Sequence, residues 1–101
     1  MRTHKLKIWP EFFEAVASGQ KTVELRRDDD GQFAVGDVLA LREYRPELTE
    51  MAEALAEPEL PYGRSVRVRV THVLRDPEGR WLQPGVVALS IRLMEEEAGE
   101  P

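Results

Sequence analysis

The 101-residue sequence contains no cysteine, which excludes a disulfide scaffold, a thiolate metal site and a cysteine nucleophile. Long apolar runs are also missing: the longest, such as residues 86–89, are far shorter than the roughly 20 residues of a membrane-spanning helix. The basic start is followed by Trp9-Pro10-Glu11 and not by an apolar signal region. We therefore expect a cytoplasmic protein with no membrane association, and the length predicts one domain over residues 1–101.

Acidic residues dominate the composition, with a net charge of -5, which argues against nucleic acid as a partner. Their distribution weakens that argument. Residues 47–60 carry five glutamates and no basic residue, and residues 93–101 carry four more glutamates. The rest of the chain has a net charge of +4. Nucleic acid binding therefore stays open, although charge blocks are more often solvated faces.

The first half of the chain alternates between strand and helix patterns. Residues 5–9 alternate charged and apolar side chains, as a half-buried strand does. Pro10 then suits a first helical turn, and apolar residues recur at helical spacing up to Gly19. Residues 22–26 alternate again, which predicts a strand with Val23 and Leu25 toward the core and a polar opposite face.

Three further strands are predicted at residues 38–44, 65–74 and 85–91. An acidic insertion at 46–62 with helix-forming composition separates the first two of these, and an acidic, frayed tail occupies 94–101. Five short strands with one early helix and no repeated βα unit indicate an α+β fold: a small, mostly antiparallel β-barrel or curled sheet.

The densest polar constellation spans the end of the predicted helix and the next strand. Lys21 follows the glycine turn, and Thr22, Glu24 and Arg26 project from one strand face at alternate positions. A cation, a hydroxyl, a carboxylate and a guanidinium would thus share one patch. The simpler interpretation from spacing alone is an ordinary surface ion network.

These residues stand in a longer pattern that resembles the ASCH domain of the PUA-like superfamily. The closest likeness is to an uncharacterised bacterial and phage ASCH-like family. The pattern consists of His4-x-Leu6-Lys7-Ile8, Pro10-Glu11-Phe12-Phe13, Gly19-x-Lys21-Thr22-x-Glu24-x-Arg26, Phe33-x-Val35-Gly36-Asp37 and Leu41-Arg42-Glu43-Tyr44. It covers residues 3–45 closely and 63–92 loosely.

The resemblance implies a PUA-like barrel with a cleft between the barrel and the early helix, a surface where related domains bind RNA or modified nucleosides. Lys21, Glu24 and Arg26 would line that cleft. Some ASCH proteins are amidohydrolases of acylated cytidine. In such an enzyme, or in a weak ribonuclease, Lys21 would act as general base with Thr22 and Glu24 beside it. Glu24, however, stands where that group has its reactive threonine.

The sequence therefore predicts an RNA- or nucleotide-binding module, with a small nucleoside amidohydrolase or ribonuclease as the alternative. The predicted binding residues are Lys21, Glu24, Arg26, Lys7, Tyr44, Arg67 and Arg69. Tyr44 would stack on a base, and the two β-strand arginines would follow a phosphate backbone, unless their alternation with valine marks a solvated face. A partner-binding role for residues 47–60 is a third possibility.

No cofactor and no metal site is predicted, because His4 and His72 lie far apart without a second ligand at metal spacing. The oligomeric state is left open.

Overall fold

A computed structural model describes residues 1–45 and 64–94 of the chain. The elements in chain order are β1 (Thr3–Ile8), α1 (Pro10–Ala17), β2 (Val23–Arg27), β3 (Val38–Glu43), β4 (Ser65–Leu74) and β5 (Val86–Leu93). Five strands and a short helix after the first strand confirm the expected mostly-β content. The predicted acidic insertion at 46–62 and residues 95–101 of the predicted tail lie outside the described residues.

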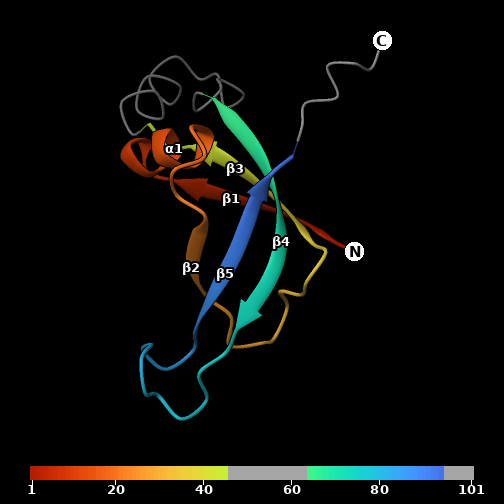
Figure 1. Ribbon diagram of the computed structural model, residues 1–101, viewed down its shortest axis with the longest axis vertical. Helices are drawn as coiled ribbons and strands as arrows, with labels where there is room; N and C mark the ends of the chain where they lie inside the picture. Colours follow the sequence, from red (N-terminus) through yellow and green to blue (C-terminus); the bar gives the residue numbers. More distant parts are fainter. Residues whose placement is uncertain (46–63, 95–101) are drawn as a thin grey trace, which may run out of the picture.

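All five strands form one mixed sheet in the order β1-β3-β4-β5-β2. The pairing of β1 with β3 is parallel, and the other three pairings are antiparallel. The strand direction turns steeply from β1 to β5, so the sheet curls into a half-barrel, with α1 at one end (Figure 1). Strands β1 and β2 are the two edges of this sheet, and the space between them is where the site described below lies.

The core fills the concave side of the curled sheet and the underside of α1. Its buried side chains are Ile8, Phe13, Val16, Phe33, Leu39, Leu41, Val68, Val70, Val87, Leu89 and Ile91. On β4 the alternation predicted from the sequence holds, with Val68 and Val70 buried and Arg67 exposed on the opposite face. A register shift between Val70 and His72 then moves Val73 back toward the core. No helix in the described ranges is long and apolar enough to span a membrane.

The Val35-Gly36-Asp37 segment fastens the parallel pair β1–β3. The buried carboxylate of Asp37 accepts hydrogen bonds from His4 Nε2 (2.8 Å) and from the amides of Arg2 (3.0 Å) and Ala34 (3.1 Å). Burial alone would raise the pKa of Asp37, but these hydrogen bonds outweigh it and lower that pKa. His4 therefore holds the start of β1 in register, in agreement with a structural role.

The orientation of β2 is opposite to the one predicted. Glu24 is 5% exposed and Arg26 is half-buried, whereas Val23 and Leu25 are 42% and 58% exposed. The prediction assumed that the apolar face of an alternating strand meets the core. Strand β2 is an edge strand that pairs only with β5 among the described strands, and its inner face meets a pocket and not the packed core. The charged residues therefore point inward.

Candidate functional site

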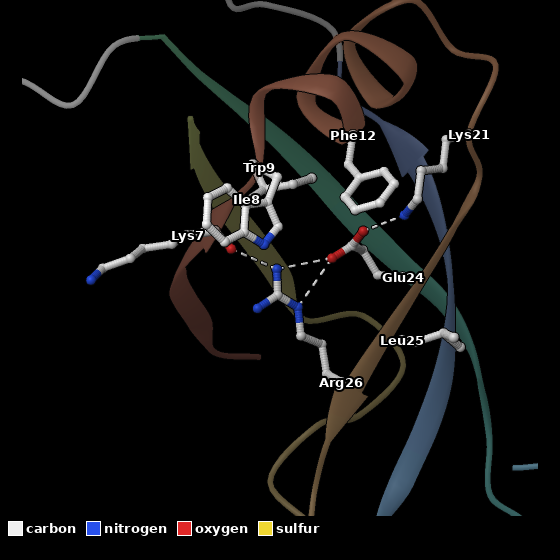
Figure 2. A pocket seen from close by; sticks show the side chains of 8 residues that line it. All are labelled: Lys7, Ile8, Trp9, Phe12, Lys21, Glu24, Leu25 and Arg26. Carbon is white, nitrogen blue, oxygen red and sulfur yellow. Dashed lines mark hydrogen bonds and ion pairs between the residues drawn. The ribbon is translucent and has the colours of Figure 1, made fainter. Parts of the chain in front are cut away.

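A pocket of about 440 Å³ lies between the end of β1, the first turn of α1 and strand β2 (Figure 2). Both edges of the half-barrel contribute to it, together with the connection from α1 to β2. The pocket is lined by Lys7, Ile8, Trp9, Phe12, Lys21, Glu24, Leu25 and Arg26. Charged groups from β2 face aromatic rings from the start of α1 across this space (Figure 2).

The turn after α1 brings Lys21 to the pocket. Helix α1 ends at Ala17, and Gly19 takes a φ of 84°, in the left-handed region that glycine occupies without steric cost. The chain reverses there, and the amide of Lys21 donates to the carbonyl of Ala15 (2.9 Å). The Lys21 side chain then points along the strand toward Glu24, as the sequence pattern predicted.

Glu24 is the centre of the polar cluster. One carboxylate oxygen, Oε1, forms an ion pair with Lys21 Nζ, and the other, Oε2, accepts from Arg26 Nε at 3.0 Å and Nη2 at 2.9 Å. A buried carboxylate without such partners would cost several kcal/mol. With one anion between two cations, the cluster keeps a net charge of +1.

Arg26 also joins the two edges of the half-barrel. Its Nη2 donates to the main-chain carbonyl of Lys7 on β1 at 2.8 Å (Figure 2). In β1 the main-chain groups of even-numbered residues form the hydrogen bonds to β3, as the bond from the Tyr44 amide to the Ile8 carbonyl shows. The carbonyl of Lys7 therefore points away from β3. A side chain thus replaces the backbone ladder that would close a barrel here.

Two aromatic rings form the opposite wall. Trp9 is 54% exposed and Phe12 is 44% exposed, so both keep a large area accessible although they are apolar. The Trp9 ring is supported from behind by Tyr44 in an edge-on contact, with 5.3 Å between centroids. Lys21 Nζ lies 5.8 Å from the centre of the Phe12 ring. The wall is therefore fixed in place and available for stacking.

Comparison with known proteins gives a family for this chain. Residues 3–91 match the family described as Domain of unknown function (DUF3850). The chain belongs to this family. The match runs from the first residue of β1 into β5 and so includes every residue of the pocket. No curated protein matches the chain.

Four of the seven predicted binding residues meet at the pocket of this DUF3850 chain: Lys7, Lys21, Glu24 and Arg26. The Lys7 side chain itself points away (Figure 2), and its Nζ lies 5.1 Å from the Tyr44 ring centre. Tyr44 does not line the pocket but supports Trp9.

The structure does not bring the two β4 arginines to this pocket. Arg67 and Arg69 alternate with the buried valines and therefore lie on the outer face of the sheet. Arg69 donates to the Gly36 carbonyl at 2.8 Å, which gives it a structural contact in the turn before β3.

The catalytic trio of the hydrolase alternative does not converge either. Thr22 is exposed and lines, together with Lys21 but without Glu24, another hollow of about 180 Å³. Its main-chain carbonyl accepts from the amide of Ile91 at 3.0 Å. Lys21 and Glu24 contact each other, but the hydroxyl lies outside the pocket that they line.

Sequence reasoning missed Trp9 and Phe12 as site residues. Neither is among the seven predicted binding residues. The signal was present in the helical spacing: Phe13 and Val16, three residues apart, are 3% and 1% exposed and define the core face. Phe12 precedes Phe13 and is turned about 100° away from it, which carries it toward the β2 side.

A second buried carboxylate, Glu43 at the end of β3, is also held by two cations. Its Oε1 accepts from Arg64 Nε (3.2 Å), and its Oε2 accepts from Arg64 Nη2 (3.1 Å) and Arg45 Nη2 (3.3 Å). The hydrogen bonds from Arg64 lower the pKa of Glu43 from 4.5 to about 2. Arg64 also pairs with Glu14 of α1 and lies 4.8 Å from the Phe13 ring. This cluster fastens β3, α1 and the start of β4 to one another.

Among the described residues, no group of three or more histidine, aspartate or glutamate side chains could hold a metal ion. The pocket offers a ligand its cations, its carboxylate and its aromatic rings.

Proposed function

We propose that this chain is a nucleotide- or RNA-binding module of the PUA-like superfamily and that the pocket between β1, α1 and β2 is its ligand site. The observation that carries the proposal is the position of Glu24: buried, held by Lys21 and Arg26, and facing two exposed aromatic rings across a pocket of about 440 Å³.

The three kinds of group match the three parts of a nucleotide. An exposed aromatic ring stacks on any base, worth roughly 1–3 kcal/mol per stacked base. Trp9 and Phe12 supply such rings. Lys21 and Arg26 can donate to phosphate oxygens or to a base carbonyl. Glu24 accepts from an exocyclic amino group or orients Arg26 for its contact.

The charge balance agrees with an anionic ligand. The cluster of Lys21, Glu24 and Arg26 is positive by one charge, and the carboxylate fixes both cations before the ligand arrives. Because the cations are already ordered, a ligand would lose less free energy in ordering them. The half-barrel with its helix after β1 is also compatible with the PUA-like fold that the motif suggested.

Hydrolysis of acylated nucleosides has less support than binding. A general base must lie within hydrogen-bond reach of the hydroxyl that it activates, whereas Lys21 Nζ donates to Glu24 and to the carbonyl of Val23. Thr22, the hydroxyl of the proposed trio, lies outside the pocket.

Filter binding of single-stranded RNA and of a mononucleotide, over a series of salt concentrations, tests the proposal. We expect binding at low salt that weakens as salt rises, and at least a tenfold loss of affinity in Lys21→Ala and Arg26→Ala. Arg92→Ala on β5 removes the same charge outside the pocket and should bind as the unaltered protein does. Absence of binding at low salt, or equal affinity in all variants, would overturn the proposal.

A further inference from the structure

A second hollow continues the pocket along β2. It measures about 560 Å³ and shares Leu25 and Arg26 with the first. Its other walls come from Arg27 of β2 and from the connection between β4 and β5, including Trp81 and Gln83. The two hollows thus form one track along the free edge of β2, which runs between α1 and the β4–β5 connection (Figure 1).

Trp81 is 74% exposed, although the segment that carries it is firmly held. The carboxylate of Asp76 accepts from the amides of Arg80 (3.0 Å), Trp81 (2.7 Å) and Leu82 (2.7 Å). These hydrogen bonds, that from Leu82 first, lower the pKa of Asp76, so it stays charged and the turn keeps its form at neutral pH. The main chain at Trp81 is thus held, while its ring stays accessible from solvent.

Basic groups lie between the two aromatic ends of the track. Arg26 faces the first pocket and also lines the second. Arg27 is exposed and has two polar partners, Asp29 at 3.5 Å and the Pro84 carbonyl at 3.3 Å. Asp29 offsets part of this charge, and Glu24 offsets part of the charge of Lys21 and Arg26. The carboxylates of Glu24 and Asp29 are thus paired with Arg26 and Arg27. The remaining N–H groups of these two arginines can donate to a ligand.

The edge of β2 along this track carries main-chain groups as well. The Thr22 carbonyl accepts from the Ile91 amide, and the Asp28 amide donates to the Gly85 carbonyl. The main-chain groups of the even-numbered residues of β2 therefore point toward β5. The amide and carbonyl of Leu25 therefore point to the opposite side, where no described strand pairs with β2. They add hydrogen-bonding groups that a base or a sugar can use.

We infer that the ligand of this site is a single-stranded nucleic acid that runs along β2, with one base on the Trp9 and Phe12 wall and a later base on Trp81. Arg26 and Arg27 contact the phosphates between them. This inference rests on the proposed function and narrows it from nucleotides in general to an oligonucleotide. Aromatic platforms joined by a basic groove are the usual means of holding single strands without strict sequence preference.

The two hollows together extend along the whole of β2, which a strand of several nucleotides fits better than a mononucleotide does. The first pocket reaches Lys21 and Glu24 before and at the start of β2, and the second reaches Val86, which pairs with Arg27 at its end. Strand β2 has five residues, and the four steps of about 3.3 Å between them place its ends roughly 13 Å apart. A mononucleotide is expected in the first pocket, where Lys21, Glu24 and Arg26 lie beside the Trp9 and Phe12 wall, and only a longer strand also reaches Trp81.

The two tryptophans of the chain make this testable by fluorescence, since each platform holds one of them. Trp81→Phe leaves Trp9 as the only indole, and Trp9→Phe leaves Trp81. Each variant is titrated with uridine monophosphate and with oligouridylates of up to about ten nucleotides, a length within the usual range of such sites. Oligodeoxythymidylates and a duplex of the same length complete the series.

We expect the monophosphate to quench Trp9 but to leave Trp81 nearly unchanged, and the longer single strands to quench both. Trp81→Ala should weaken oligonucleotide binding about five- to 150-fold and leave monophosphate binding unaltered. Val35→Ala, which trims an exposed apolar side chain away from the track, serves as the control.

The outcomes separate this inference from the proposed function. If the monophosphate quenches Trp9 but longer strands bind no more tightly and never quench Trp81, the extended track is wrong and the nucleotide pocket stands. Equal binding of the duplex would also overturn it, because paired bases cannot stack on protein rings. If no nucleotide of any length changes either signal, both proposals fail together.

Discussion

Glu24 and Glu43 are both buried carboxylates held by two basic side chains, yet their surroundings differ. Glu43 is 1% exposed, and its oxygens are used by Arg64 and Arg45 within the fold. Glu24 lies at an edge of the sheet, beside an open pocket and opposite two exposed rings. The same ion-pair chemistry thus stabilises the fold at Glu43 and lines a candidate ligand site at Glu24. A buried ion cluster indicates function only where it borders space for a ligand.

The largest expected difference between the two is in stability. Glu43→Gln removes the buried charge that Arg64 and Arg45 hold and should lower the free energy of unfolding by about 2–3 kcal/mol. For a domain of this size that lowers Tm by about 10–20 °C. Glu24→Gln should cost about 1 kcal/mol, because Lys21 and Arg26 remain partly in water.

Thermal unfolding followed by circular dichroism measures both changes. Glu14→Gln, which removes the exposed partner of Arg64, is the control and should cost less than about 1 kcal/mol. If Glu24→Gln lowered the free energy of unfolding as much as Glu43→Gln or more, the distinction between a structural cluster at Glu43 and a ligand site at Glu24 would be wrong.

The structural role of Glu43 should also appear in how the free energy of unfolding changes at acid pH. The pKa of Glu43 is depressed from 4.5 to about 2 in the folded protein, so the unfolded chain binds its proton first as the pH falls. The stabilisation from Glu43 is complete above pH 4.5 and is lost progressively toward pH 2. Asp28 and Asp37 also have lowered pKa values and add to the loss. Urea unfolding at several pH values should show a shallower decline in Glu43→Gln than in the unaltered protein; parallel curves would rule out this linkage.

Ligand binding should respond to the shape of the Arg26 side chain as well as to its charge. Arg26→Lys keeps the positive charge but loses the fork that reaches Glu24 and the Lys7 carbonyl together. We expect about a tenfold loss of nucleotide affinity by filter binding, from one charge-assisted contact. Arg92→Lys provides the matched exchange outside the pocket. Full affinity in Arg26→Lys would show that the guanidinium geometry is not used.

The smallest effect is expected on the outer face of β4. The combined change of Arg67 and Arg69 to alanine should leave nucleotide affinity and its salt dependence unaltered, because both residues lie on the opposite face of the sheet from the core. Loss of Lys21, by contrast, should reduce the salt slope by about 1. A smaller slope in the β4 double variant would extend the binding surface beyond the β2 edge.

Local patterns predicted the elements of this fold well. The spacing of Phe13 and Val16, with Pro10 before and Gly19 after, marks α1 because these features act within one or two turns. The alternation at 65–74 marks β4 with its bounds as observed. The parallel pairing of β1 with β3 was not predicted, since it joins segments more than thirty residues apart and has no local signature.

The site was predicted in part for the same reason. Lys21, Glu24 and Arg26 are close in sequence, so their convergence follows from a turn and a strand. Alternation alone does not determine which face of β2 points inward. That depends on the pocket between the two edge strands β1 and β2, which the inner face of β2 meets in place of a packed core. The partnership of Glu43 with Arg64 spans 21 positions, so no local pattern predicts it.

Salt-dependent filter binding of single-stranded RNA to the unaltered protein and to the Lys21→Ala, Arg26→Ala double variant tests the central claim most directly. The account predicts binding at low salt that falls steadily as salt increases, and loss of nearly all of it in the double variant while Arg92→Ala binds normally. RNA bound equally by all three proteins, or by none of them at the lowest salt, would contradict it.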